Sequence, residues 1–412
     1  MTKIPTNITT KIAIIGGGAA GFFAALACAK KYPTYQVSII EKTSKILSKV
    51  KVSGGGRCNV THECFEISRL AKSYPRGEKF LKNTFHHFAV KDTINWFSER
   101  GIELKTEADG RMFPITDDSQ TIIDCFLAEA KKLHIDIRTS TEIKSIELND
   151  KTHNFRLETQ HGFEIFDKVI VAAGGSPKLD NFQWLAKLGL QIETPIPSLF
   201  TFNLPKNPIT ELMGVAIPAA RVRISDTKLT QEGVVLITHW GLSAYAILKL
   251  SAWGARILAD KKYNFSALIA WLPNYNEEKL REELYIIKKD FATRQVANKN
   301  PFGLPSRLWE FLLKKLAIPT EKRWADITKL ELNQLNNILL NDSYEVSGKT
   351  TFKEEFVTCG GVNLSEVDFN TMQSKKIKGL YFAGEVLDID GITGGFNFQA
   401  AWTTGFVAGQ LG

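Results

Sequence analysis

The sequence predicts an α/β fold in which both ends of the chain build one parallel sheet and the middle of the chain is an insertion. Three observations predict it: a strand, glycine turn and helix near the N-terminus, a buried strand that ends in glycines before residue 176, and a second strand, glycine turn and helix at 378–409. The chain has 412 residues, which is enough for two or three domains.

The first of these elements is typical of a dinucleotide site. "KIAII" at 11–15 is a short apolar run, as in a buried parallel strand, and it leads into Gly16-x-Gly18-x-x-Gly21 and a helix. In such a turn the first glycine permits the bend, the second lets the backbone approach phosphate, and the third lets helix and strand pack closely. The next strand ends in Glu41, 20 residues after Gly21, where an acid accepts ribose hydroxyls. The pattern predicts a Rossmann-like domain.

The same N-terminal run could also be a signal peptide or a membrane anchor, because no charged residue occurs between Ile12 and Ala29. A membrane-spanning helix needs about 20 apolar residues. Here three glycines interrupt the run after four apolar residues, and the short strand before them fits a folded domain better. We therefore expect neither export nor membrane insertion.

Charge and cysteine content add three expectations. The net charge is +8, from 52 basic and 44 acidic residues, but the excess is spread along the chain, so a nucleic-acid partner is not expected. Five cysteines without a CxxC motif argue against a disulfide framework and for a reducing, cytoplasmic location. Cys58, His62 and Cys64 lack the repeated spacing of a zinc site, so no metal is predicted.

Two further glycine-rich segments favour FAD over NAD as the dinucleotide. "SGGGRCNVTH" at 53–62 follows the strand that ends in Glu41, and its backbone amides can crowd around a ligand while Arg57 adds a cation. A flexible surface loop is the alternative. After a helical pattern at 79–100, another at 119–134 and a small antiparallel meander, a buried strand ends in "AAGG" at 172–175. Small residues there permit backbone contact with a cofactor. FAD domains of the glutathione-reductase class have this arrangement.

The C-terminal segment "KGLYFAGEVLDIDGITGGFNFQAAWTTGFVAG" at 378–409 supplies the last part of the predicted site. Glu385 follows a strand, where its carboxylate can accept a ribityl hydroxyl. A helix at about 397–408 begins after the glycine pair at 394–395, and its N-terminus would favour negative charge on the reduced flavin. A packing helix rich in small residues is the alternative. No second GxGxxG follows a strand, so NAD(P)H would bind transiently, without its own Rossmann domain.

Together with "DGRMFPITDDSQT" at 109–121 and "THWGLS" at 238–243, these segments resemble the BaiN-type bacterial flavoproteins, a family also labelled NAD(P)/FAD-dependent oxidoreductase and aminoacetone oxidase-like. The resemblance covers nearly the whole chain. It implies bound FAD and a discontinuous FAD domain whose insertion has a β-rich and a small helical part. The chain departs from the family at His62, which replaces Asn, at Trp240, which replaces Tyr, and at Ala244-Tyr245, which replace Gly-Pro.

We expect the Rossmann-like FAD-binding domain at 1–192 and 357–412, an inserted β-rich domain at 193–275 and 342–356, and a helical subdomain at 276–341. The residues predicted to bind FAD are Gly16, Gly18, Ala19, Ala20, Gly21, Glu41, Lys42, Gly55, Arg57, Cys58, Asn59, Ala173, Gly174, Gly384, Glu385, Gly395, Asn397 and Phe398. The candidates for proton transfer are His239, Tyr245 and Asp390. A structural role is the alternative for His239.

These features predict a cytoplasmic FAD-dependent oxidoreductase that transfers a hydride between flavin N5 and a small organic substrate, with NAD(P)H as a candidate electron donor. A reductase of an activated C=C bond and an amine oxidase both fit. The sequence leaves open the substrate, the electron donor or acceptor and the oligomeric state. The alternative is an FAD-bound regulatory or RNA-associated protein without turnover that uses the basic insertion.

Overall fold

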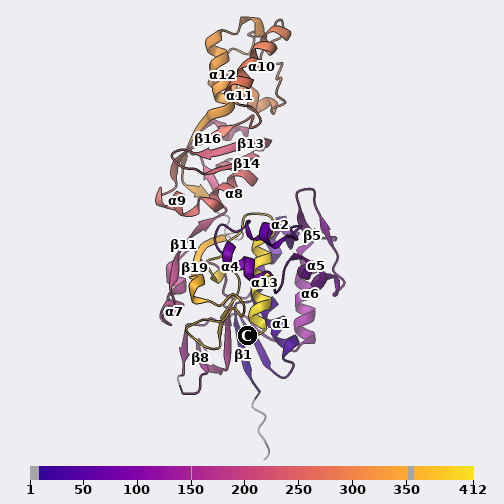
Figure 1. The fold of residues 1–412 in the computed structure, drawn as a ribbon, viewed down its shortest axis with the longest axis vertical. Helices are drawn as coiled ribbons and strands as arrows, with labels where there is room; N and C mark the ends of the chain where they lie inside the picture. Colours follow the sequence, from indigo (N-terminus) through magenta and orange to yellow (C-terminus); the bar gives the residue numbers. More distant parts are fainter. Residues whose placement is uncertain (1–8, 150, 351–356) are drawn as a thin grey trace, which may run out of the picture. The chain divides into compact units, whose positions relative to one another are not determined.

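The computed structural model describes residues 9–149, 151–350 and 357–412, and the chain divides into two compact units (Figure 1). Unit 1 is formed by both ends of the chain, Met1–Pro197 and Phe352–Gly412, and unit 2 is the insertion between them, Ser198–Thr351. The finer division of the insertion into a β-rich and a helical domain stays a prediction.

A parallel five-stranded sheet lies at the centre of unit 1. Its strands, in spatial order, are β20 (Leu380–Phe382), β10 (Lys168–Val171), β1 (Lys11–Ile15), β2 (Gln36–Ile40) and β6 (Asp136–Arg138). Helix α1 (Ala19–Lys31) packs against β1, β2 and β10, and the side chains of the middle of β1 are fully buried, as is usual in parallel sheets. The outermost strand on one side comes from the C-terminal segment, so the sheet is complete only when the two ends of the chain pair. This confirms the predicted α/β fold.

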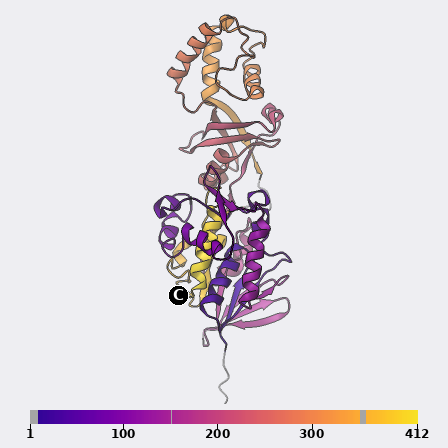
Figure 2. The same cartoon turned by 90° about the vertical axis from the view of Figure 1, so that its right-hand side faces the viewer.

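Two helices from opposite ends of the chain pack on each other in unit 1: α1 (Ala19–Lys31) and α13 (Phe396–Gly409), which is yellow in Figures 1 and 2. Their backbones come very close. A Cβ atom at Gly405 would lie 2.7 Å from the carbonyl oxygen of Ala20, and one at Gly409 would lie 2.5 Å from that of Ala24. Glycine is therefore required at both positions, which explains the small residues of the C-terminal helix.

The remaining elements of unit 1 surround this sheet and helix pair. The predicted meander is present as β7 (Ser145–Leu148), β8 (Phe155–Thr159) and β9 (Gly162–Phe166). A second small sheet contains β3 (Thr61–His62), β5 (Arg111–Pro114) and β4 (Leu104–Thr106), and a third pairs β11 (Ile192–Ser198) with β19 (Val357–Val362). The other helices are α2 (Ser48–Gly56), α3 (Ile67–Ala71), α4 (Glu78–Thr84), α5 (Val90–Ser98), α6 (Ser119–Lys132) and α7 (Gln183–Ala186).

One predicted helix is interrupted. The pattern at 79–100 predicted continuous helix, but the chain forms α4 and α5 with a turn between them. The carboxylate of Asp92 accepts a hydrogen bond of 2.8 Å from the backbone N–H of Ala89 and so caps the start of the second helix. Both segments bury apolar side chains, Phe80 and Leu81 in α4 and Val90 and Phe97 in α5.

Unit 2 is built on an antiparallel seven-stranded sheet in the order β17-β16-β13-β14-β15-β12-β18. The strands are β12 (Thr201–Asn203), β13 (Ala216–Ile224), β14 (Thr230–Ile237), β15 (Gly241–Ser243), β16 (Asn264–Ala270), β17 (Asp342–Ser347) and β18 (Lys349–Thr350). The helices are α8 (Tyr245–Trp253), α9 (Ala255–Asp260), α10 (Glu277–Asp290), α11 (Ser306–Lys315) and α12 (Lys329–Asn341), of which the last three group together beyond the sheet (Figures 1 and 2). One continuous apolar core joins this sheet and these helices.

Among the described residues, every helix is too short or too polar to cross a bilayer. The described part of the chain also contains no group of three or more His, Cys, Asp and Glu side chains that could hold a metal ion.

Candidate functional site

The turn after β1 shows why each of its three glycines is there. Gly16 has a φ of +113°, and a Cβ atom on it would lie 2.3 Å from the carbonyl oxygen of Ala172. A Cβ atom on Gly21 would lie 1.9 Å from the carbonyl oxygen of Gly16, so the helix and the strand touch there. Gly18 is different, because its φ is −91° and no protein atom lies within 4 Å of its Cβ position. The fold does not require glycine at Gly18, and the open space suits a ligand.

Glu41, at the end of β2, lies directly beside this turn. One oxygen of its carboxylate accepts a hydrogen bond from the backbone N–H of Gly17 at 2.8 Å. The other accepts bonds from the backbone N–H and the hydroxyl of Thr43, each at 2.8 Å. The carboxylate is thus fixed at the edge of the turn, where an acid on the second strand of a Rossmann-like domain receives ribose hydroxyls.

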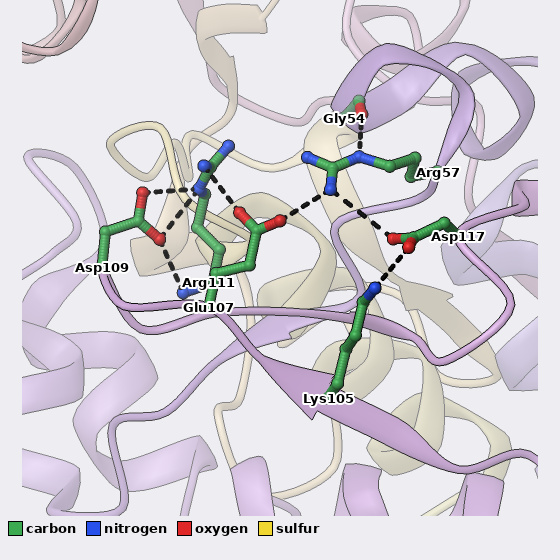
Figure 3. Close-up of polar contacts among 7 residues, drawn as sticks. All are labelled: Gly54, Arg57, Lys105, Glu107, Asp109, Arg111 and Asp117. Carbon is green, nitrogen blue, oxygen red and sulfur yellow. Dashed lines mark hydrogen bonds and ion pairs between the residues drawn. The ribbon is translucent and has the colours of Figure 1, made fainter.

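The glycine loop at 53–57 is anchored by an ion-pair network (Figure 3). Gly54, Gly55 and Gly56 all have positive φ, and the Cβ positions of the last two face open space. Arg57 donates a hydrogen bond of 2.6 Å to Glu107 and lies 4.0 Å above the ring of Phe113.

The network then extends along the neighbouring hairpin. Glu107 also accepts a bond of 2.8 Å from Arg111, and Asp117, 3.5 Å from Arg57, is paired with Lys105. The hydrogen bond to Glu107 raises the pKa of Arg57, and Lys105 lowers the pKa of Asp117. The position of the Arg57 guanidinium group is therefore fixed by the carboxylates of Glu107 and Asp117.

Cys58 and Asn59 follow the glycine loop and differ in what they can do. Burial of Cys58 raises the pKa of its thiol to about 12, so the thiol is neutral at physiological pH and is a poor nucleophile. The carboxamide of Asn59, in the orientation that satisfies its neighbours, donates to the carbonyl of Thr61 and accepts from the backbone N–H of Gly395, each at 3.0 Å. Asn59 therefore ties the loop to the start of α13.

The second glycine turn and the Glu385 carboxylate lie on the C-terminal segment. Gly395 precedes α13 with a φ of +91°, and Asn397 braces the turn through hydrogen bonds to both backbone groups of Gly391. Glu385 accepts hydrogen bonds from the backbone N–H of Thr358 at 2.7 Å and from Lys49 at 2.6 Å. The hydroxyl of Thr358 is buried beside it and has no hydrogen-bond partner among the described residues. An orphaned polar atom next to a carboxylate suits a hydroxyl-rich ligand.

These observations fit FAD. The open glycines, the two carboxylates, the orphaned hydroxyl and the N-terminus of α13 all belong to unit 1. Gly174, predicted at the end of β10, has a φ of +74° and open space at its Cβ position. Phe398 instead stacks on Trp402 with ring centroids 5.4 Å apart, so its ring serves packing.

Sequence reasoning did not assign His62 to the site, although it noted the residue as a departure from the family. The Nδ1 atom of His62 lies 3.0 Å from the carbonyl oxygen of Gly394, and its ring stacks on Phe396 at 4.6 Å. Burial lowers the pKa of the imidazole. The neutral ring with its proton on Nδ1 is the form that donates to this carbonyl, so His62 braces the turn before α13.

The three candidates for proton transfer lie in different surroundings. Asp390, in unit 1, is fully buried and forms an ion pair through both carboxylate oxygens with Arg76. His239 and Tyr245 lie in unit 2, and both side chains are exposed. Between them, Ala244 has a φ of +74° and a ψ of −169°, which is a glycine-like backbone in front of α8.

Comparison with known proteins agrees with this geometry. The family model described as HI0933-like protein Rossmann domain matches residues 10–411. A 3-dehydro-bile acid delta(4,6)-reductase of Clostridium scindens is 27% identical over 410 residues, which are 97% of this chain and 98% of that protein. A ribosomal RNA dihydrouridine synthase of Escherichia coli is 29% identical over 411 residues, which are 96% of each chain. The match confirms the resemblance seen in the sequence.

A solved structure shows the same fold at lower identity. FrdA of Escherichia coli quinol fumarate reductase aligns with a TM-score of 0.50 and 15% identity, over 98% of this chain and 69% of that chain. At this identity the likeness concerns the architecture alone. The Rossmann-like domain with a large insertion is thereby confirmed as the fold class.

The same substitution at Gly18 and at Gly21 should affect different properties, FAD binding in the first case and stability of the fold in the second. Gly18→Val adds a side chain to open space, so the protein should fold normally but purify without FAD. Gly21→Val drives a side chain into the carbonyl group of Gly16, so it should lower the free energy of unfolding by about 1–3 kcal/mol or more. Flavin absorbance per mole of protein and urea unfolding would measure both effects. Full flavin content in Gly18→Val would contradict the placement of the diphosphate.

His62 predicts a pH dependence of stability. Because burial lowers its pKa below the ordinary 6.5, its contribution to the free energy of unfolding is complete above that pH and is lost as the pH falls toward the lowered pKa. His62→Asn should remove this part of the decline in melting temperature of the FAD-bound protein. The matched control is His153→Asn, an exposed histidine with a φ of +54° that asparagine tolerates. Equal pH profiles for the two variants would contradict the assignment.

Proposed function

Since this chain belongs to the HI0933-like Rossmann family, we propose that it reduces a C=C bond conjugated to a carbonyl group. The broader class is an enzyme, an FAD-dependent oxidoreductase. The finer proposal has three parts. The reacting bond is a C=C bond conjugated to a carbonyl group, electrons flow from the flavin to the substrate, and the electron donor is NAD(P)H. No Rossmann motif other than the one at Gly16–Gly21 is available in the sequence to hold the donor permanently.

The names of the two relatives support the reacting bond. A 3-dehydro bile acid with double bonds at positions 4 and 6 has C=C bonds conjugated to a ketone, and the first relative is named a reductase of that group. Dihydrouridine is uridine whose C5=C6 bond, conjugated to the C4 carbonyl, has been saturated, and the second relative is named a synthase of that product. Both align over nearly the whole chain, and both names describe the same kind of reduction.

The chain supplies binding, orientation and charge, whereas bound FAD supplies hydride chemistry at N5. The turn at Gly16–Gly21 and the N-terminus of α1 suit the diphosphate. Glu41 suits the adenosine ribose and Glu385 the ribityl chain. The positive end of the α13 helix dipole favours negative charge on the pyrimidine edge of the ring.

The reaction needs one hydride and one proton. NAD(P)H gives up two electrons as a hydride and becomes NAD(P)⁺, the substrate gains hydrogen at the carbon β to its carbonyl, and a proton adds at the α carbon. We propose His239 and Tyr245 as sources of this proton, because each carries a group that can donate a proton and each side chain is exposed. Asp390 is fully buried, and both of its carboxylate oxygens are bonded to Arg76, so we do not propose it as the proton donor. We propose that Asp390 instead positions the segment that leads into α13.

An anaerobic test of the purified yellow protein follows from this proposal. NADPH or NADH should bleach the flavin, and a 4-ene-3-oxo steroid or a uridine-containing RNA should restore its absorbance. Tyr245→Phe should slow the second step by on the order of 10²-fold and leave bleaching unchanged. The matched control is Tyr275→Phe, which removes the hydroxyl of a partly exposed tyrosine elsewhere in unit 2.

Each other outcome has a meaning. A flavin that no nicotinamide or metabolite reduces would favour the alternative of an FAD-bound protein without turnover. Reduction by an amine, followed by reoxidation only by oxygen, would favour an oxidase. Either result would contradict the proposed reductase.

A further inference from the structure

The helices α10 and α12 of unit 2 enclose a polar groove with a volume of about 590 Å³. One wall is the row Glu277, Arg281 and Tyr285 on α10, and the other is a row of four residues on α12 that begins at Lys329. Residues four apart on a helix lie on one face, about 6 Å from each other. The groove is therefore lined by two facing rows of side chains, and neither row contains an aliphatic residue.

The row on α12 is unusual for a helix. After Lys329 it consists of Asn333, Asn337 and Asn341, all exposed. Asparagine is a poor helix former, up to about 0.7 kcal/mol per residue less favourable than alanine. Lysine, glutamate or glutamine would suit exposed helix positions better. The carboxamide oxygen of Asn341, the last residue of α12, accepts a hydrogen bond of 2.5 Å from Arg223. The cost at Asn333 and Asn337 is therefore the local conflict that marks a functional site.

A buried amide points to a missing ligand group at the same place. Asn336 lines the groove but is only 3% exposed, and its NH₂ group donates a hydrogen bond of 3.0 Å to the carbonyl of Glu277. Its Oδ1 atom has no hydrogen-bond partner among the described residues. Buried acceptors are normally satisfied, so the floor of the groove offers an unused acceptor.

The charge of unit 2 is also suited to a polyanion. Residues 198–351 contain 21 Lys and Arg against 15 Asp and Glu, so this insertion holds most of the excess of +8. The excess is therefore not evenly spread over the fold, contrary to the expectation from the linear sequence. In the groove itself Arg281 is paired with Glu277 at 2.8 Å, and Lys329 adds a second cation near the exposed ring of Tyr285.

We propose that the α10–α12 groove binds unpaired bases of a single-stranded RNA that carries the substrate. Carboxamides both donate and accept, as base edges require, a tyrosine ring can stack on a base, and cations neutralise phosphates. A steroid would need an apolar lining, which this groove lacks. The inference deepens the proposed function and rests on it, because it selects the uracil ring of an RNA as the conjugated substrate.

Binding of a fluorescently labelled oligouridylate to the oxidised, FAD-bound protein tests the groove without turnover. The double variant Asn333→Ala/Asn337→Ala should weaken binding about 10-fold or more, since each lost hydrogen bond is worth about 1 kcal/mol. Alanine improves helix propensity, so unfolding would not explain a loss. The matched control is Gln334→Ala, an exposed amide on the same helix outside the groove. Unchanged binding in the double variant, or equal losses in both variants, would overturn the proposal.

The reductase function and the RNA-binding groove can be tested independently of each other. Reduction of a small enone by NAD(P)H should be unaffected by the double variant, because neither asparagine belongs to the flavin site. If the enone is reduced but the oligouridylate does not bind, the groove is not an RNA site and the reductase stands. If the RNA binds through the asparagines but the flavin is never reduced, the groove stands and the reductase function is contradicted.

Discussion

The close approach of α13 to α1 is the contact on which the rest of the structure depends. Gly405 and Gly409 let the two helices touch backbone to backbone, and β20 pairs with β10 in the same part of the fold. Because all strands of the sheet are parallel, their carboxyl ends share one edge. The turn at Gly16–Gly21 and the segment that holds Glu385 are thereby brought to one site, although almost the whole chain separates them in sequence.

Two kinds of glycine separate packing from binding in this site. Gly16, Gly21 and Gly405 are required by neighbouring protein atoms, whereas Gly18 and Gly55 face open space. Open glycines, carboxylates fixed by backbone amides and a buried hydroxyl without a partner describe a surface shaped for a hydroxyl-rich diphosphate. Close backbone contacts therefore occur where the two ends of the chain pack together, whereas Gly18 and Gly55, which are predicted to face the cofactor, are not crowded by protein atoms. The amide-lined groove of unit 2 is the proposed site of substrate recognition.

Local features of this fold could be predicted from the sequence, and long-range pairs could not. The strand, glycine turn, helix and Glu41 follow one another within a short segment, so their spacing alone predicts the site. The bond from His62 to Gly394 and the pair of Arg76 with Asp390 each join residues more than 300 positions apart, and no periodicity reveals them. The groove likewise exists only because α10 and α12 pack on each other, which aligns the asparagines of one helix with Arg281 of the other.

A crystal structure of the protein purified with its flavin would test the shared site most directly. We predict electron density for one FAD, with its diphosphate at the backbone of Gly18 and the pyrimidine edge of its ring at the start of α13, near Gly395. Density for the flavin ring away from the C-terminal segment, or FAD held by unit 2, would contradict a site formed by the two ends of the chain.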